Sequence, residues 1–146
     1  MANQLTNKYQ MKATKIINTG SAIILGLFAL LTLFLSSSVI FNWFGVRAKE
    51  GNYVLLIVWA NFICSILYLF AAYGFIKRAK WTFWVLIIAL IILIIAFAAL
   101  LIHINNGGIH EEKTIGAMIF RMSITLTFSL VALIKFNKSL WRKHSY

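Results

Sequence analysis

The chain has 146 residues, of which 62% are hydrophobic and 12% are charged, and its 14 Lys and Arg against three acids give a net charge of +11. This composition excludes an ordinary soluble domain and indicates a single integral membrane domain with about four spans. The bases gather at the ends of the predicted spans, where the positive-inside rule and anionic lipid headgroups account for them, so we expect no nucleic-acid partner.

The first predicted span covers residues 16–41 and follows a polar segment that carries three lysines and no acid. Small side chains let two membrane helices approach each other closely. One face of this span carries such a row, with an amide at its start: Asn18, Ala22, Gly26 and Ala29. We therefore expect this face to pack against another helix.

The second and third spans are predicted at 53–76 and 81–104. The 22 residues of 81–102 include one polar side chain, Thr82, and no charge, and a helix of that length crosses a hydrocarbon core of ~30 Å. Because only residues 77–80 connect the two spans, these spans must be antiparallel neighbours. Both carry small residues on one face: Ala60, Cys64, Ala71 and Gly74 in the second, and Ala89 and Ala96 in the third.

The fourth span is predicted at 114–135, after an eleven-residue loop, HINNGGIHEEK, at 103–113. A basic tail follows at 136–146. Basic segments next to a membrane span commonly lie on anionic headgroups of the inner leaflet, so we expect lipid contact for the tail.

The distribution of basic residues predicts the orientation of the chain. Ten Lys and Arg lie in the N-terminal segment, the 77–80 connection and the C-terminal tail counted from Lys135, against three in the other two loops. The positive-inside rule then places both termini in the cytoplasm. The sequence therefore predicts an all-α, four-transmembrane-helix bundle with up-down-up-down topology, in a bacterial inner membrane.

Arg121 is a charged residue well inside a predicted span, where an arginine costs up to ~2.5–3.5 kcal/mol. Thr125 and Ser129 follow it on the same helix face, so this polar stripe is expected to face the bundle interior. Two interpretations are open: an ion pair that fixes a loop over the bundle, or an anion or substrate site that opens outward. The candidate partners are one amide and three loop glutamates: Asn61, Glu50, Glu111 and Glu112.

The loop at 103–113 supplies a second candidate site. His103, His110, Glu111 and Glu112 carry groups that bind zinc or copper. Their spacing matches no compact helical pair of ligands, so a solvated loop is the other interpretation.

Several functions are disfavoured by residues that the spans lack. No acid lies inside a span, which disfavours a proton-coupled exporter, and no Ser/His/Asp or Cys/His set lies at membrane depth, which disfavours an intramembrane hydrolase. We expect a non-enzymatic protein without a cofactor that acts by helix association, as a homo-oligomer or as an accessory or scaffold subunit of another membrane protein. The first alternative is a small transporter or pore-forming oligomer with Arg121 in its pathway, and the second is an outward-facing metal or redox site.

Overall fold

A computed structural model describes the backbone of residues 1–49 and 54–141, and the side chains of these residues up to position 135. The described part is all-α and contains no strand. Its helices are α1 (Ala2–Ile40), the 3-10 turn η1 (Trp43–Gly45), α2 (Val46–Lys49), α3 (Leu55–Lys77), α4 (Trp81–Asn105) and α5 (Glu112–Trp141). Four of them, α1, α3, α4 and α5, are long and apolar enough to cross a membrane. The predictions of an all-α fold and of four helices apolar enough to span a membrane are confirmed.

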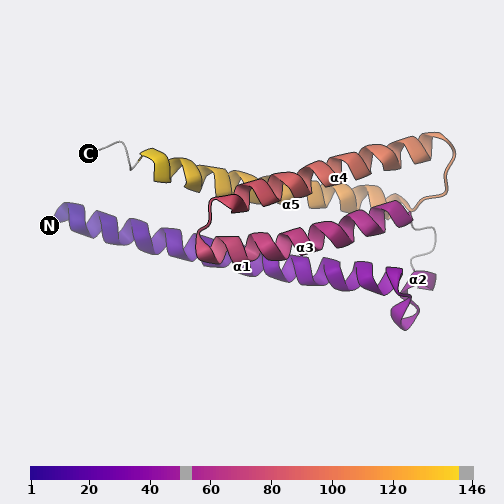
Figure 1. Ribbon diagram of the computed structural model, residues 1–146, viewed down its shortest axis with the longest axis horizontal. Coiled ribbons are helices and arrows are strands. Elements are labelled where there is room, and N and C mark those ends of the chain that lie inside the picture. Colours follow the sequence, from indigo (N-terminus) through magenta and orange to yellow (C-terminus); the bar gives the residue numbers. More distant parts are fainter. Residues whose placement is uncertain (50–53, 142–146) are drawn as a thin grey trace.

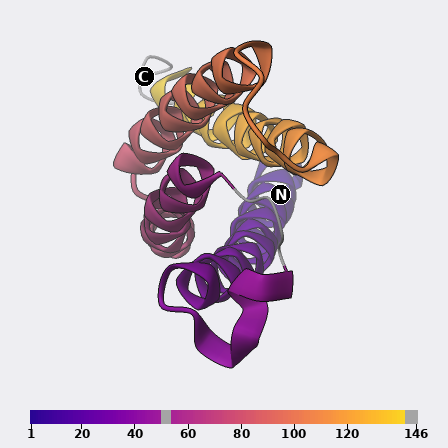
Figure 2. The ribbon, with the colours of Figure 1, turned by 90° about the vertical axis from the view of Figure 1, so that its right-hand side faces the viewer.

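The four long helices lie lengthwise beside one another in an elongated bundle (Figure 1). The start of α1, the end of α5 and the turn between α3 and α4 lie at one end, which we call the terminal end. Helix α2 and the connection between α4 and α5 lie at the opposite end, which we call the loop end. Backbones pack closely between α1 and α3, between α3 and α4, and between α4 and α5, so neighbours in the chain are also neighbours in space (Figure 2).

The fourth side of the bundle, between α1 and α5, is joined through side chains. The rings of Phe28 on α1 and Phe120 on α5 meet edge to face, with their centroids 6.3 Å apart. Phe28 also contacts Tyr68 of α3, at a centroid distance of 5.7 Å. The backbones of α1 and α5 are therefore farther apart than those of the other three neighbouring helix pairs, and aromatic rings fill the space between them.

Helix α1 begins at Ala2, well before the apolar span predicted at 16–41. The chain has no proline, and no glycine precedes Gly20, so nothing stops the helix from extending through the polar segment. At 39 residues, α1 is roughly twice as long as the hydrocarbon core is thick. Its polar first third therefore extends beyond the membrane, with its side chains exposed.

Helix α1 ends where the chain reverses into η1. Asn42 adopts the left-handed conformation, with φ 54°. Arg47 then reaches back, and its Nε and Nη2 atoms donate hydrogen bonds to the carbonyl oxygens of Val39 and Ile40, at 3.0 and 2.9 Å. A basic side chain that caps the last carbonyls of a helix fixes the adjoining loop to it. This arrangement holds α2 at the loop end of the bundle.

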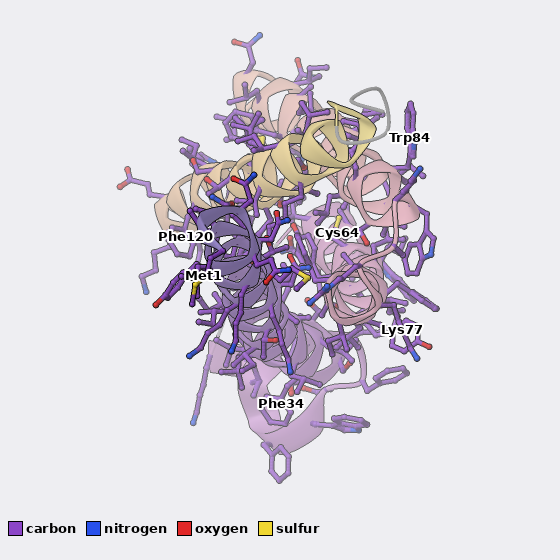
Figure 3. All side chains as sticks on the ribbon, turned by 90° about the vertical axis from the view of Figure 1, so that its left-hand side faces the viewer. Met1, Phe34, Cys64, Lys77, Trp84 and Phe120 are labelled. Carbon is purple, nitrogen blue, oxygen red and sulfur yellow. The ribbon has the colours of Figure 1, made fainter. Side chains whose placement is uncertain are left out.

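The bundle is apolar outside and has small or polar residues inside. Large apolar side chains such as Trp84 and Phe34 point outward, whereas Cys64 lies near the middle of the bundle (Figure 3). The predicted small-residue faces are buried between helices of this one chain, which uses them to bring its own backbones together. The residues concerned are Asn18, Ala22 and Ala29 on α1, Ala60, Cys64, Ala71 and Gly74 on α3, and Ala89 and Ala96 on α4.

The turn between α3 and α4 depends on Gly74. Arg78 takes the left-handed conformation, and the N–H of Ala79 bonds to the Gly74 carbonyl at 2.9 Å, which closes the end of α3. This tight turn brings Thr82 of α4 against the Gly74 backbone. A Cβ atom at position 74 would lie 2.2 Å from the Thr82 Oγ1 atom. Only glycine fits between these two helices without a shift.

Gly74→Ala is expected to lower the free energy of unfolding by ~1–3 kcal/mol, because the added methyl group overpacks the contact with Thr82. The measurement is the midpoint of thermal unfolding in detergent micelles. Gly20→Ala is the matched control, since a Cβ atom there meets nothing within 4 Å and alanine favours the helix. Equal midpoints for the two variants would contradict the overpacking.

Candidate functional site

The loop end of the bundle contains a cavity of about 230 Å³, which we call the loop-end cavity. Its walls come from α1, α2, α3 and α5, together with the segment that leads into α5. Ser36 and Val39 of α1, Asn61 of α3 and Arg121 of α5 are among the residues that line it. The structure thus brings together two members of the polar cluster that the sequence predicts.

Arg121 is half-buried in the wall of this cavity. Its Nε atom is buried and has no hydrogen-bond partner among the described residues. Neither Glu111 nor Glu112 forms an ion pair with it, although Glu111 lines the same cavity. Glu50, the third predicted partner, lies outside the described residues. The guanidinium group therefore has no carboxylate partner in the part of the chain that the structure describes.

Asn61 contributes a second polar atom without a partner. Its Oδ1 atom is buried in α3 and makes no hydrogen bond to a described residue. Because the oxygen and nitrogen of an amide exchange places by a flip of the side chain, Asn61 presents either an acceptor or a donor to the cavity. Leaving such a group unsatisfied costs ~1–3 kcal/mol, so the site favours a ligand or water that bonds to it.

Thr125 and Ser129 lie on α5 below Arg121 and are fully buried. Each hydroxyl donates to the carbonyl one turn back, Thr125 to Arg121 and Ser129 to Thr125, both at 2.7 Å. Such bonds satisfy a hydroxyl within its own helix. The predicted stripe does face the bundle interior, and its two hydroxyls are engaged in α5 rather than open toward the cavity.

Tyr68 on α3 is a member of this cluster that the sequence analysis did not single out. Its hydroxyl lies 2.5 Å from the Oγ1 atom of Thr125. Since the single hydrogen of Thr125 goes to the Arg121 carbonyl, Tyr68 must be the donor. A chain of two hydrogen bonds thus links α3 to the backbone of Arg121. Tyr68 follows Asn61 and Ser65 at helical spacing (i, i+4 and i+7). This spacing in the sequence could have placed Tyr68 on the buried face of α3.

The loop histidines bond to the backbone of their own loop. His103 Nε2 contacts the Ile109 carbonyl and His110 Nδ1 contacts the Gly108 carbonyl, both at 3.2 Å. The described residues contain no group of three or more His, Cys, Asp or Glu side chains that is placed to hold a metal ion. Among the described residues, His103, His110, Glu111 and Glu112 therefore do not form such a cluster, and the metal or redox alternative stays a prediction.

No protein-family model matches the chain, and neither the curated proteins nor the solved structures that were compared with it show a match. The chemistry of the site must therefore be argued from its residues alone. Among the described residues, Lys49, Lys113 and Arg121 line the loop-end cavity against one acid, Glu111. Cationic walls, an unpaired guanidinium atom and an unpaired amide suit a small anion that also forms hydrogen bonds.

Tyr68→Phe is expected to lower the free energy of unfolding by ~0.5–1.5 kcal/mol, because it removes the buried bond to Thr125. Denaturation in detergent micelles measures the change. Tyr73→Phe is the control, since Tyr73 is exposed on the same helix. If both variants unfolded like the wild type, the Tyr68 bond would not hold α3 to α5.

Proposed function

We propose that this chain is a small multi-pass membrane protein that binds a small anion in the loop-end cavity and carries it across the membrane. The observation that supports the proposal is the Nε atom of Arg121, which is buried in the cavity wall without a partner among the described residues. An arginine at membrane depth is costly and is commonly found where an ion or substrate passes. The planar guanidinium group binds carboxylates and phosphates through paired hydrogen bonds.

The competing hypothesis is that the chain acts by helix association, as an accessory subunit or homo-oligomer. That hypothesis relied on the small-residue faces of the spans. These faces are buried between helices of the same chain. They therefore favour packing within the chain, and the unpaired polar atoms of the loop-end cavity favour anion binding. We retain the expectation that the protein is not an enzyme.

We also propose that the bundle crosses a bacterial inner membrane in up-down-up-down fashion, with both termini in the cytoplasm. Two observations support this orientation. Ten of the bases lie in residues 1–15, 77–80 and 135–146. The start of α1, the end of α5 and that turn lie at the same end of the bundle (Figure 1). The loop-end cavity then opens to the outside of the cell.

Cysteine labelling tests this orientation. Cys64 is buried, and replacing it with alanine gives a background without thiols. In that background, Asn106→Cys at the loop end is expected to react with a membrane-impermeant maleimide in intact cells. Ala79→Cys at the terminal end is expected to react only after the membrane is opened. The reverse pattern would invert the proposed orientation.

Uptake into proteoliposomes tests the anion site, with small carboxylates and inorganic anions supplied one at a time. Arg121→Gln is expected to reduce uptake by about tenfold or more, because it removes the charge-assisted hydrogen bonds to the anion. Arg121→Lys is expected to be intermediate, since an ammonium group keeps the charge but not the paired geometry.

The matched control is Lys12→Gln, which removes the same charge from the exposed, protruding part of α1. This variant is expected to transport like the wild type. The proposal fails if Arg121→Gln transports as fast as Lys12→Gln, or if no anion of the panel is taken up by the wild-type protein.

A further inference from the structure

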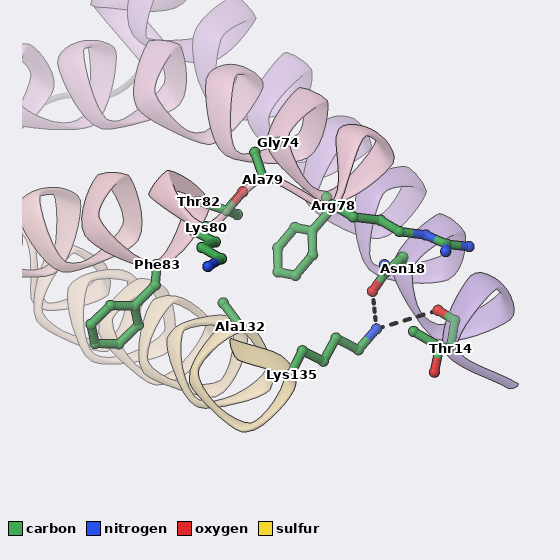
Figure 4. Close-up of a pocket in the computed structure, with 11 residues that line it drawn as sticks. Thr14, Asn18, Gly74, Arg78, Ala79, Lys80, Thr82, Phe83, Ala132 and Lys135 are labelled. Atoms are coloured by element: carbon green, nitrogen blue, oxygen red, sulfur yellow. Dashed lines mark hydrogen bonds between the residues drawn. The ribbon is translucent and has the colours of Figure 1, made fainter. Parts of the chain in front are cut away.

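A second cavity, also of about 230 Å³, lies at the terminal end of the bundle, and we call it the terminal-end cavity. All four long helices and the turn between α3 and α4 contribute to its wall, which includes Thr82 and Lys135 (Figure 4). The Lys135 ammonium donates to two neutral acceptors, the Asn18 side-chain oxygen and, at 3.5 Å, the Thr14 carbonyl. None of the described lining residues is acidic. The described part of this wall thus carries positive charge and no negative charge.

A layer of side chains lies between the two cavities, which share no lining residue. On each helix that lines both cavities, one member of the layer lies between the residues of one cavity and those of the other: Phe28 on α1, Tyr68 on α3 and Thr125 on α5. The ring centroids of Phe28 and Tyr68 are 5.7 Å apart, and the Tyr68 hydroxyl bonds to Thr125. Phe120 adjoins Phe28 from the exposed edge of α5. We call these four residues the middle layer.

The buried face of α1 changes from polar to apolar and back to polar along the bundle. From the terminal end to the loop end, its buried residues are Asn18, Ser21, Ala22, Leu25, Ala29, Thr32 and Ser36. The polar members lie toward the two cavities, and the apolar members lie near the level of Phe28. An apolar constriction between two polar regions closes a path to ions, because water leaves it. The middle layer has this character on its α1 side.

The seam between α1 and α5 is the side of the bundle that can open at least cost. The backbones of these two helices do not pack closely, in contrast to those of the other three sides. Phe28 is half-buried in the seam, where its ring contacts Tyr68 and Phe120. A ring contact of this kind shifts an equilibrium by only about two- to tenfold. Movement of one side chain therefore loosens the seam without disturbing the small-residue contacts of α3.

We propose that the anion crosses the bundle along the α1–α5 seam, from the loop-end cavity to the terminal-end cavity, and that Phe28 is the gate between them. The inference rests on the proposed function, since the anion of the loop-end cavity is the transported ligand. The structure has the gate closed, with the Phe28 ring against Tyr68 and Phe120. Rotation of Phe28 toward the lipid opens it, while Tyr68 stays bonded to Thr125 and keeps α3 attached to α5.

The accessibility of a cysteine beyond the gate tests the proposal without requiring transport. Ser129 is buried on α5, one helical turn past Thr125 toward the terminal end. In the Cys64→Ala background, Ser129→Cys is treated with an anionic, membrane-impermeant methanethiosulfonate on the side where Asn106→Cys reacts. We expect Phe28→Ala to accelerate its labelling by about tenfold, because two ring contacts that close the layer are lost.

Two matched controls accompany this experiment. Phe34→Ala removes the same ring from the outward side of α1 and is expected to leave the labelling of Ser129→Cys unchanged (Figure 3). Ser36→Cys lies in the wall of the loop-end cavity, before the gate, and is expected to react equally fast with and without the Phe28 ring.

Phe120→Ala decides the question if Phe28→Ala fails to fold. It removes one of the two ring contacts from the exposed edge of the seam, so a several-fold acceleration of Ser129→Cys labelling is expected. The gate is overturned if Ser129→Cys reacts equally fast in the wild-type and gate-variant backgrounds, or if Phe34→Ala accelerates it as much.

Uptake into proteoliposomes separates this proposal from the proposed function. Phe28→Ala is expected to raise the rate of anion uptake about tenfold, and Phe34→Ala is expected to leave it unchanged. Uptake by the wild-type protein that Phe28→Ala does not change would overturn the seam as the route and leave the transport function standing. No uptake by the wild-type protein, with Ser129→Cys still accelerated by Phe28→Ala, would overturn the transport function and leave Phe28 as the barrier between the two cavities.

Discussion

Inside a bilayer, a polar group must find its hydrogen-bond partner within the protein, because lipid tails offer none. The long helices satisfy their own backbones, and hydroxyls such as those of Ser38 and Ser129 bond to a carbonyl one turn back. Among the described residues, three buried side-chain atoms remain without a partner, and they belong to Asn61, Thr82 and Arg121. All three residues line a cavity. The polar atoms that the fold leaves unsatisfied therefore belong to residues that line two cavities of the described structure.

The cavities follow from the way in which the four sides of the bundle are closed. Burial of apolar surface does not drive helix association in lipid, so close packing requires small residues. Such residues line the contacts between α1 and α3 and between α3 and α4, and the backbones there approach closely. Between α1 and α5, the rings of Phe28 and Phe120 stand in the seam instead. Both cavities have walls from these two helices, at opposite ends of the same seam.

The two ends carry the same sign of charge for different physical reasons. At the terminal end, Arg78, Lys80 and Lys135 belong to the excess of bases that the positive-inside rule explains, and all three line a cavity there. At the loop end, Arg121 lies within a span, so the positive-inside rule does not explain it. Its position is maintained from α3, because Tyr68 donates to Thr125 and Thr125 donates to the Arg121 carbonyl. An anion is the ligand that the loop-end environment favours.

Hydrophobicity and length determined the four apolar helices from the sequence alone, because a span needs about 20 apolar residues and the bilayer accepts little else. The helix-face spacing likewise predicted that the stripe below Arg121 points inward. The sequence pattern did not predict where α1 begins. The apolar residues start near position 16, whereas the helix, which no proline interrupts, starts at Ala2. Only the tertiary structure placed Tyr68 against Thr125, left Arg121 without Glu111 or Glu112, and set Thr82 in a cavity with Lys135. These contacts join residues of different helices. A single sequence does not show which helix faces meet or how far apart their side chains hold the helices.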